Sequence, residues 1–145
     1  MKLIVFIILT ILNIAFSQTA PTNTLNVKIT VNSFKSNSGV ARLLIFNNDE
    51  GFPGEMELAI VKAVTTIENS IATFDLIVPS GEHAVVILHD ENNNNEIDTA
   101  WYGKPIEGFG VSNDPKSSFG PPDYEDSTII FIEEKKNFII TMRYF

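Results

Sequence analysis

The residues that could do chemistry are concentrated in one run of oxygen-bearing side chains at positions 89–98. Acids and amides recur there at alternate positions, directly after the apolar run at 84–88. Calcium takes about six to eight oxygen ligands, and the helix-flanked calcium loop supplies them from positions 1, 3, 5, 7, 9 and 12. The spacing therefore predicts a calcium site. Its ligands, counted from position 1, are Asp90, Asn92, Asn94, Glu96 through its backbone carbonyl, and Asp98.

Two departures from that loop weaken the predicted site. Asn95 stands where the loop has glycine, although asparagine tolerates the left-handed backbone conformation well. Position 12 is Trp101, so the closing carboxylate has to come from Asp98, Glu107 or the acids at 123–126. The alternative is a solvated turn in which Asn and Asp hydrogen-bond to their own backbone. Neutral amides at two ligand positions predict weak binding, in the millimolar range of extracellular modules.

The N-terminus has the pattern of an export signal. Lys2 precedes an apolar run at 3–14, and the small residues Ala15 and Ser17 fit a cleavage site. The apolar run is shorter than the roughly 20 residues that a membrane helix needs. We expect a signal peptide at 1–17, a flexible leader at 18–23 and one domain at 24–145. The domain would be periplasmic or extracellular, with no stable membrane insertion after cleavage.

The net charge of the chain disfavours some classes of binding partner. The 145-residue chain carries a net charge of −8 and no cysteine. An acidic surface disfavours nucleic acid, whose affinity depends on Lys and Arg contacts to phosphate. It also disfavours anionic membrane surfaces and favours cations. We therefore expect an unknown protein or glycan as the partner.

Short apolar segments with period-2 alternation predict seven β-strands. They lie at residues 25–31, 40–46, 60–67, 71–78, 83–89, 127–132 and 138–144. The uninterrupted apolar run at 84–88 predicts a central strand covered on both faces. Turns at 36–39 and 133–137 predict a hairpin near each end of the domain. Such a strand series predicts an antiparallel β-sandwich, and the aromatic-rich segment 91–126 predicts one long ordered loop.

Five segments carry a family resemblance. They are Gly-Val-Ala-Arg-Leu-Leu-Ile-Phe-Asn at 39–47, Glu-Gly-Phe-Pro at 50–53, Pro-Ser-Gly-Glu-His-Ala at 79–84, the run from 89 to 98, and Gly-Lys-Pro-Ile-Glu-Gly-Phe-Gly-Val-Ser-Asn at 103–113. In this order they closely resemble an uncharacterised bacterial family, the domain of unknown function numbered 2141. The resemblance implies exported proteins with a transthyretin-like or immunoglobulin-like β-sandwich and no established activity. The family's loop reads Asp-x-Asn-x-Asn-Gly-x-Leu-Asp, from which Asn95 and Ile97 depart.

Catalytic motifs are absent from the sequence. It has no cysteine nucleophile, Gly-x-Ser-x-Gly elbow, His-Glu-x-x-His motif or phosphate-binding glycine loop. His83 and His89, the only histidines, would lie about 20 Å apart along one strand. His89 reads either as a hydrogen-bonded structural histidine or as a base beside Asp90. The numerous acids leave a small hydrolase that uses loop carboxylates as a second alternative.

Aromatic and amide side chains of the long loop predict a binding surface, because amphipathic aromatics dominate such contacts. The candidate residues are Trp101, Tyr102, Phe109 and Asn113. The alternative is that these side chains fold inward and close an end of the sandwich. We expect a non-enzymatic binding or structural module of unknown ligand. The leading alternative is a carbohydrate-binding accessory module.

Overall fold

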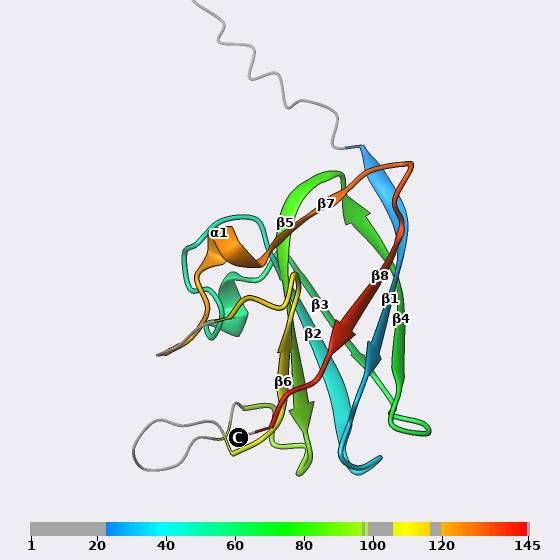
Figure 1. The fold of residues 1–145 in the computed structure, drawn as a ribbon, viewed down its shortest axis with the longest axis vertical. Helices are drawn as coiled ribbons and strands as arrows, with labels where there is room; N and C mark the ends of the chain where they lie inside the picture. The colour runs from blue at the N-terminus through cyan, green and yellow to red at the C-terminus, as the bar shows by residue number, and fades with distance from the viewer. Residues whose placement is uncertain (1–22, 97, 99–105, 117–119, 145) are drawn as a thin grey trace, which may run out of the picture.

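The computed structural model describes residues 23–96, 98, 106–116 and 120–144. The predicted signal peptide and the candidate surface residues Trp101 and Tyr102 lie outside these residues. Within the described part of the chain the fold is all-β, with eight strands in two sheets (Figure 1). No helix in this part is long and apolar enough to cross a membrane.

The two sheets differ in size. The smaller contains β4 (Ala72–Pro79), β1 (Thr24–Asn32) and β8 (Asn137–Thr141), in that order. The larger contains β3 (Val61–Thr65), β2 (Val40–Phe46) and β5 (Gly81–Asp90), followed by β6 (Phe109–Val111) and β7 (Thr128–Phe131), which pair with successive parts of β5. The helical elements are a 3-10 turn, η1 (Met56–Leu58), and the one-turn helix α1 (Tyr124–Ser127).

The main core lies between the two sheets. Alternation in β1 buries Leu25, Val27, Ile29 and Val31, and the opposing strand β5 contributes Val85 and Ile87. On the outer face of the larger sheet, a second cluster of Leu44, Phe46, Val86 and Leu88 is covered by side chains from η1, α1 and neighbouring segments. Strand β5 is therefore covered on both faces, as its uninterrupted apolar run predicts.

Three details of the predicted sandwich are wrong. There are eight strands rather than seven, because β6 lies inside the segment predicted to be a loop. Neither predicted hairpin forms: β1 pairs with β4 and β8, while β2 pairs with β3 and β5. The pair of β1 with β8 is parallel, so the sandwich is not wholly antiparallel. The connections from β1 to β2 and from β7 to β8 each pass from one sheet to the other.

The physical reason is that alternation identifies a half-buried strand without identifying its neighbour. Strands that face one core from opposite sheets have the same pattern as strands that pair. A turn between two such strands therefore fits a change of sheet as well as a hairpin.

Candidate functional site

Asp90, the last residue of β5, is the anchor of the loop formed by residues 90–98, here called the 90–98 loop. Its carboxylate is fully buried and lies 2.6 Å from Nε of Arg42, which comes from the adjacent strand β2. The backbone N–H of Asn94 donates to Oδ1 and that of Asn95 donates to Oδ2, each at 3.1 Å. The Arg42 guanidinium also donates to the side-chain oxygen of Asn95. The loop therefore folds around a buried ion pair.

The ionisation of Asp90 follows from these contacts. Burial alone raises the pKa of the carboxyl group. The hydrogen bonds from Arg42, Asn95 and Asn94, together with the charge of Arg42, outweigh burial and hold the pKa below its usual range. Asp90 is therefore a carboxylate at neutral pH, compensated by a fixed cation.

Side-chain amides close the remainder of the loop. The Nδ2 groups of Asn92 and Asn94 donate to the two carboxylate oxygens of Asp98, at 2.7 and 2.9 Å. Their side-chain oxygens accept from the backbone N–H groups two residues later, those of Asn94 and Glu96, at 3.0 and 2.9 Å. Asn95 takes the left-handed conformation predicted from its place in the loop, with φ of 67°. Four predicted ligands thus belong to one hydrogen-bonded loop, and Glu96 contributes its backbone while its side chain is exposed.

The fit to a calcium ion is partial. Within the described residues, no three or more His, Asp or Glu side chains form a group that could hold a metal ion. Asp90 accepts three hydrogen bonds, one of them from a guanidinium, so a cation beside it would meet Arg42. Glu107, a candidate closing acid, instead accepts from the backbone N–H of Glu91 at 2.9 Å. Asp98 is the carboxylate that the loop presents together with the amides of Asn92 and Asn94.

His89 is hydrogen-bonded through both of its ring nitrogens. It is fully buried, with Nε2 lying 2.8 Å from the Ser38 carbonyl and Nδ1 lying 2.8 Å from the Tyr144 hydroxyl. Because a carbonyl only accepts, Nε2 carries the proton in the neutral ring and Nδ1 accepts from Tyr144. Burial raises the pKa of the Tyr144 hydroxyl, which keeps it protonated as that donor. Both ring nitrogens are thus used in holding the β1–β2 connection and the C-terminal segment against β5.

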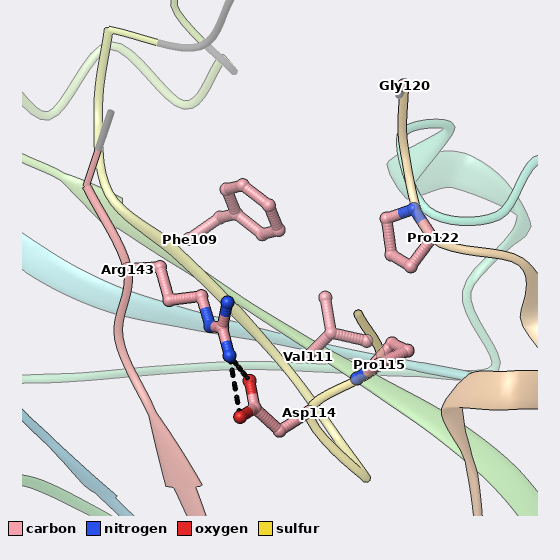
Figure 2. Close-up of a pocket in the computed structure, with 7 residues that line it drawn as sticks. All are labelled: Phe109, Val111, Asp114, Pro115, Gly120, Pro122 and Arg143. Carbon is pink, nitrogen blue, oxygen red and sulfur yellow. Dashed lines mark hydrogen bonds and ion pairs between the residues drawn. The ribbon is translucent and has the colours of Figure 1, made fainter. Parts of the chain in front are cut away.

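A second candidate site lies beside β6 and is here called the β6 pocket. Figure 2 shows its lining: Phe109, Val111, Asp114, Pro115, Gly120, Pro122 and Arg143. Its volume is about 90 Å³, and it is open to solvent. The Nη2 group of Arg143 lies 2.6 Å from both carboxylate oxygens of Asp114.

The predicted surface residues divide between two roles. Phe109 lines the β6 pocket, whereas the exposed Asn113 donates its side-chain amide to the Asp126 carbonyl at 2.8 Å. Asn113 therefore anchors the turn after β6 to α1.

Sequence reasoning missed Arg42, Asp114 and Arg143. For Arg42 a signal existed, because an arginine within an apolar strand requires a counter-charge. The pairing of Asp114 with Arg143 had no local signal, since 29 positions separate them.

The approach of Gly39 to Asp90 generates a prediction. Gly39 has φ of +68°, and a Cβ there would lie 2.0 Å from the Asp90 carbonyl oxygen. We expect Gly39→Ala to lower the free energy of unfolding by about 3 kcal/mol or more, through backbone strain and the clash. Gly120→Ala is the matched control, because Gly120 has φ of +77° and, among the residues that the structure describes, no atom lies within 4 Å of the added Cβ. It should cost about 1 kcal/mol. Equal losses in urea unfolding would show that the approach to Asp90 is unimportant.

Removing the cation beside Asp90 generates a pH prediction. At pH 7, Arg42→Met should lower the free energy of unfolding by about 3–5 kcal/mol, because it leaves a buried carboxylate without its partner. Asp90 has a lowered folded pKa, so its stabilisation is present above the unfolded value of about 4 and is lost as pH falls through the folded value. The difference between the variant and the natural protein in free energy of unfolding should therefore shrink as pH falls below about 4.

Urea unfolding at a series of pH values measures this difference. Lys28→Met is the control, because it breaks the exposed Lys28–Asp75 pair, in which the side chains are 49% and 72% exposed. It should cost less than about 1 kcal/mol. A pH-independent difference for Arg42→Met would argue against charge compensation of Asp90.

Comparison with known proteins places the chain in a family without a known activity. No curated protein and no solved structure matches it at significance. The model of the family described as an uncharacterized protein conserved in bacteria, DUF2141, matches residues 29–139, well over half of the chain. The protein therefore belongs to this uncharacterised bacterial family.

Proposed function

We propose that the protein is an exported, non-enzymatic β-sandwich module that binds a ligand at the β6 pocket, beside the 90–98 loop. We further propose that the sandwich is of the immunoglobulin-like or transthyretin-like type. The pairing of a three-stranded sheet with a larger one supports that type. Export rests on the N-terminal signal pattern and predicts a mature chain that begins at Gln18.

The observation that carries the binding proposal is the composition of the β6 pocket. Its apolar walls hold two charged side chains, Asp114 and Arg143, and these pair with each other. Ligand sites combine mostly apolar walls with a few placed polar groups in this way. Acid/base glycoside cleavage uses two carboxyl groups across the scissile bond, whereas the described lining has one, engaged by arginine. The pocket therefore favours binding over the hydrolase alternative.

The 90–98 loop attaches this pocket to the rigid centre of the larger sheet. The backbone N–H of His89 donates to the Gly108 carbonyl at 2.9 Å, next to Phe109 of the pocket. Asp98 accepts the Ile106 backbone N–H on its carbonyl at 3.0 Å, at the other end of the same segment. Strand β5 thus fixes one end of the chain that leads into β6, and the 90–98 loop fixes the other.

Calcium is a proposed weak ligand of this loop. We propose that Asp98 supplies the charge and that the side chains of Asn92 and Asn94 supply neutral oxygens, while Asp90 stays committed to Arg42. One carboxylate with amide oxygens suits the millimolar affinities of extracellular modules. The ion would replace the amide donors that now contact Asp98 and would stiffen the loop.

Thermal melting in calcium and in chelator tests this proposal. An ion at ten times its Kd should raise the free energy of unfolding by roughly 1.4 kcal/mol. Asp98→Asn should abolish that rise and change stability in chelator by less than about 0.5 kcal/mol. Asp90→Asn should instead destabilise the protein in both conditions, because its partner is Arg42. Magnesium at equal ionic strength controls for screening. Identical melting in calcium and chelator would contradict calcium binding.

Export has its own test. Protein recovered from the periplasm or medium of an expressing bacterium should begin at Gln18 in N-terminal sequencing. Retention in the cytosol with Met1 intact would contradict the export proposal.

A further inference from the structure

We propose that the β6 pocket binds a neutral, hydroxylated ring, the chemistry of a sugar unit in an uncharged oligosaccharide. This inference rests on the proposed function, since it names the ligand class of the same pocket. It follows from the polar pair, from its net charge and from the shape of the apolar walls.

The polar pair can both donate to and accept from a ligand. Asp114 is held by Nη2 of Arg143, so Nε–H and the Nη1–H groups of the guanidinium are available as donors. The Asp114 carboxylate has about four lone-pair sites, which is more than Nη2 alone can occupy, so it can also accept from a ligand. A hydroxyl group donates and accepts at once, so neighbouring hydroxyls can contact the arginine and the carboxylate together. The side chains of Arg143 and Asp114 are 46% and 59% exposed, which leaves both accessible.

The charge of the pair selects against ions. Arg143 and Asp114 sum to zero within the pocket, and the whole chain carries −8. An anion attracted by the guanidinium would be repelled by the adjacent carboxylate and by the overall field. A cation attracted by the carboxylate would meet the guanidinium. A neutral ligand with paired donors and acceptors meets neither penalty.

The apolar walls suit the carbon–hydrogen face of a ring. Figure 2 shows Phe109 and Arg143 on one side of the pocket and Pro115 and Pro122 on the other, with Val111 between them. Aromatic and proline rings are rigid, so they contact a ligand at a small loss of conformational entropy. The pocket is shallow, with a volume of about 90 Å³, so it would contact one face of a ring rather than enclose it.

Both halves of the polar pair are fixed before a ligand arrives. Arg143 and Phe109 exchange backbone hydrogen bonds at 3.0 and 2.8 Å, which ties the segment after β8 to β6. Asp114 follows Asn113 in a turn where both residues have left-handed backbones, with φ of 64° and 47°. Asparagine and aspartate adopt this conformation more readily than other non-glycine residues. The turn is held in place because Asn113 donates to the Asp126 carbonyl.

Nitrogen-15 NMR of the protein expressed from its full sequence tests the inference, with side-chain Nε–H signals as probes. The chain has two arginines, Arg42 and Arg143, which report on the 90–98 loop and the β6 pocket respectively. The titrants are neutral oligosaccharides built from glucose, xylose, mannose or N-acetylglucosamine, an oligogalacturonate and a proline-rich peptide. We expect a neutral oligosaccharide to shift the Arg143 signal and to leave the Arg42 signal in place.

Matched variants separate direct contact from general charge effects. Asp114→Asn and Arg143→Met should each weaken binding of that oligosaccharide by about tenfold or more, as expected for lost hydrogen bonds to charged groups. Asp75→Asn removes another exposed acid of an ion pair, on the smaller sheet, and should change binding by less than twofold.

Each outcome is decisive. Preference for the oligogalacturonate or the peptide at Arg143 overturns the sugar inference and leaves the binding module standing. No shift of the Arg143 signal with any titrant overturns both. Equal weakening by Asp75→Asn also overturns the inference, because binding would then depend on overall charge.

Discussion

A carboxylate at the end of a central strand, with no contact to water, constrains the rest of this structure. Asp90 lies at 0% side-chain exposure and Arg42 at 17%, so each needs the other as its partner. A buried charge that loses its partner costs several kcal/mol, whereas the intact pair is close to neutral for stability. The pair therefore adds little to the free energy of unfolding, but it restricts the geometry of the chain around it. It holds β2 and β5 in one register and turns the chain after Asp90 back towards Arg42.

The same end of β5 fixes the C-terminal segment. His89 accepts a hydrogen bond from the Tyr144 hydroxyl. That hydroxyl also accepts one from the Lys35 backbone N–H, at 3.1 Å. Gly108 is required where Tyr144 packs, because a Cβ there would lie 2.2 Å from the tyrosine ring. Tyr144 thereby positions its neighbour Arg143 beside Asp114. The hydrogen bonds of the buried His89 are thus linked, through Tyr144, to the position of Arg143 in the β6 pocket.

What the sequence predicts well is local. Alternation locates β1, and the uninterrupted run at 84–88 identifies β5 as covered on both faces. The left-handed Asn95 follows from its place in a nine-residue pattern. What fails is pairing between distant segments. β6 has three residues and exists because β5 offers an edge on one side and Arg143 on the other. Arg42 and Arg143 acquire their roles from partners 48 and 29 positions away, which no local periodicity encodes.

A fixed guanidinium and a calcium ion are two ways to compensate the negative charge of a loop. Both compensate an acid-rich turn, but arginine is supplied by the fold itself, while calcium must be drawn from solution. Because Arg42 already holds Asp90, the start of the loop keeps its shape at any calcium concentration. The charge of Asp98 is compensated only in part, because its partners are amide donors. If calcium binds as proposed, it would divide the loop into a half next to β5 that stays ordered without the ion and a half around Asp98 that the ion would stiffen. The half next to β5 adjoins the strand that pairs with β6, so the β6 pocket would keep its form without the ion.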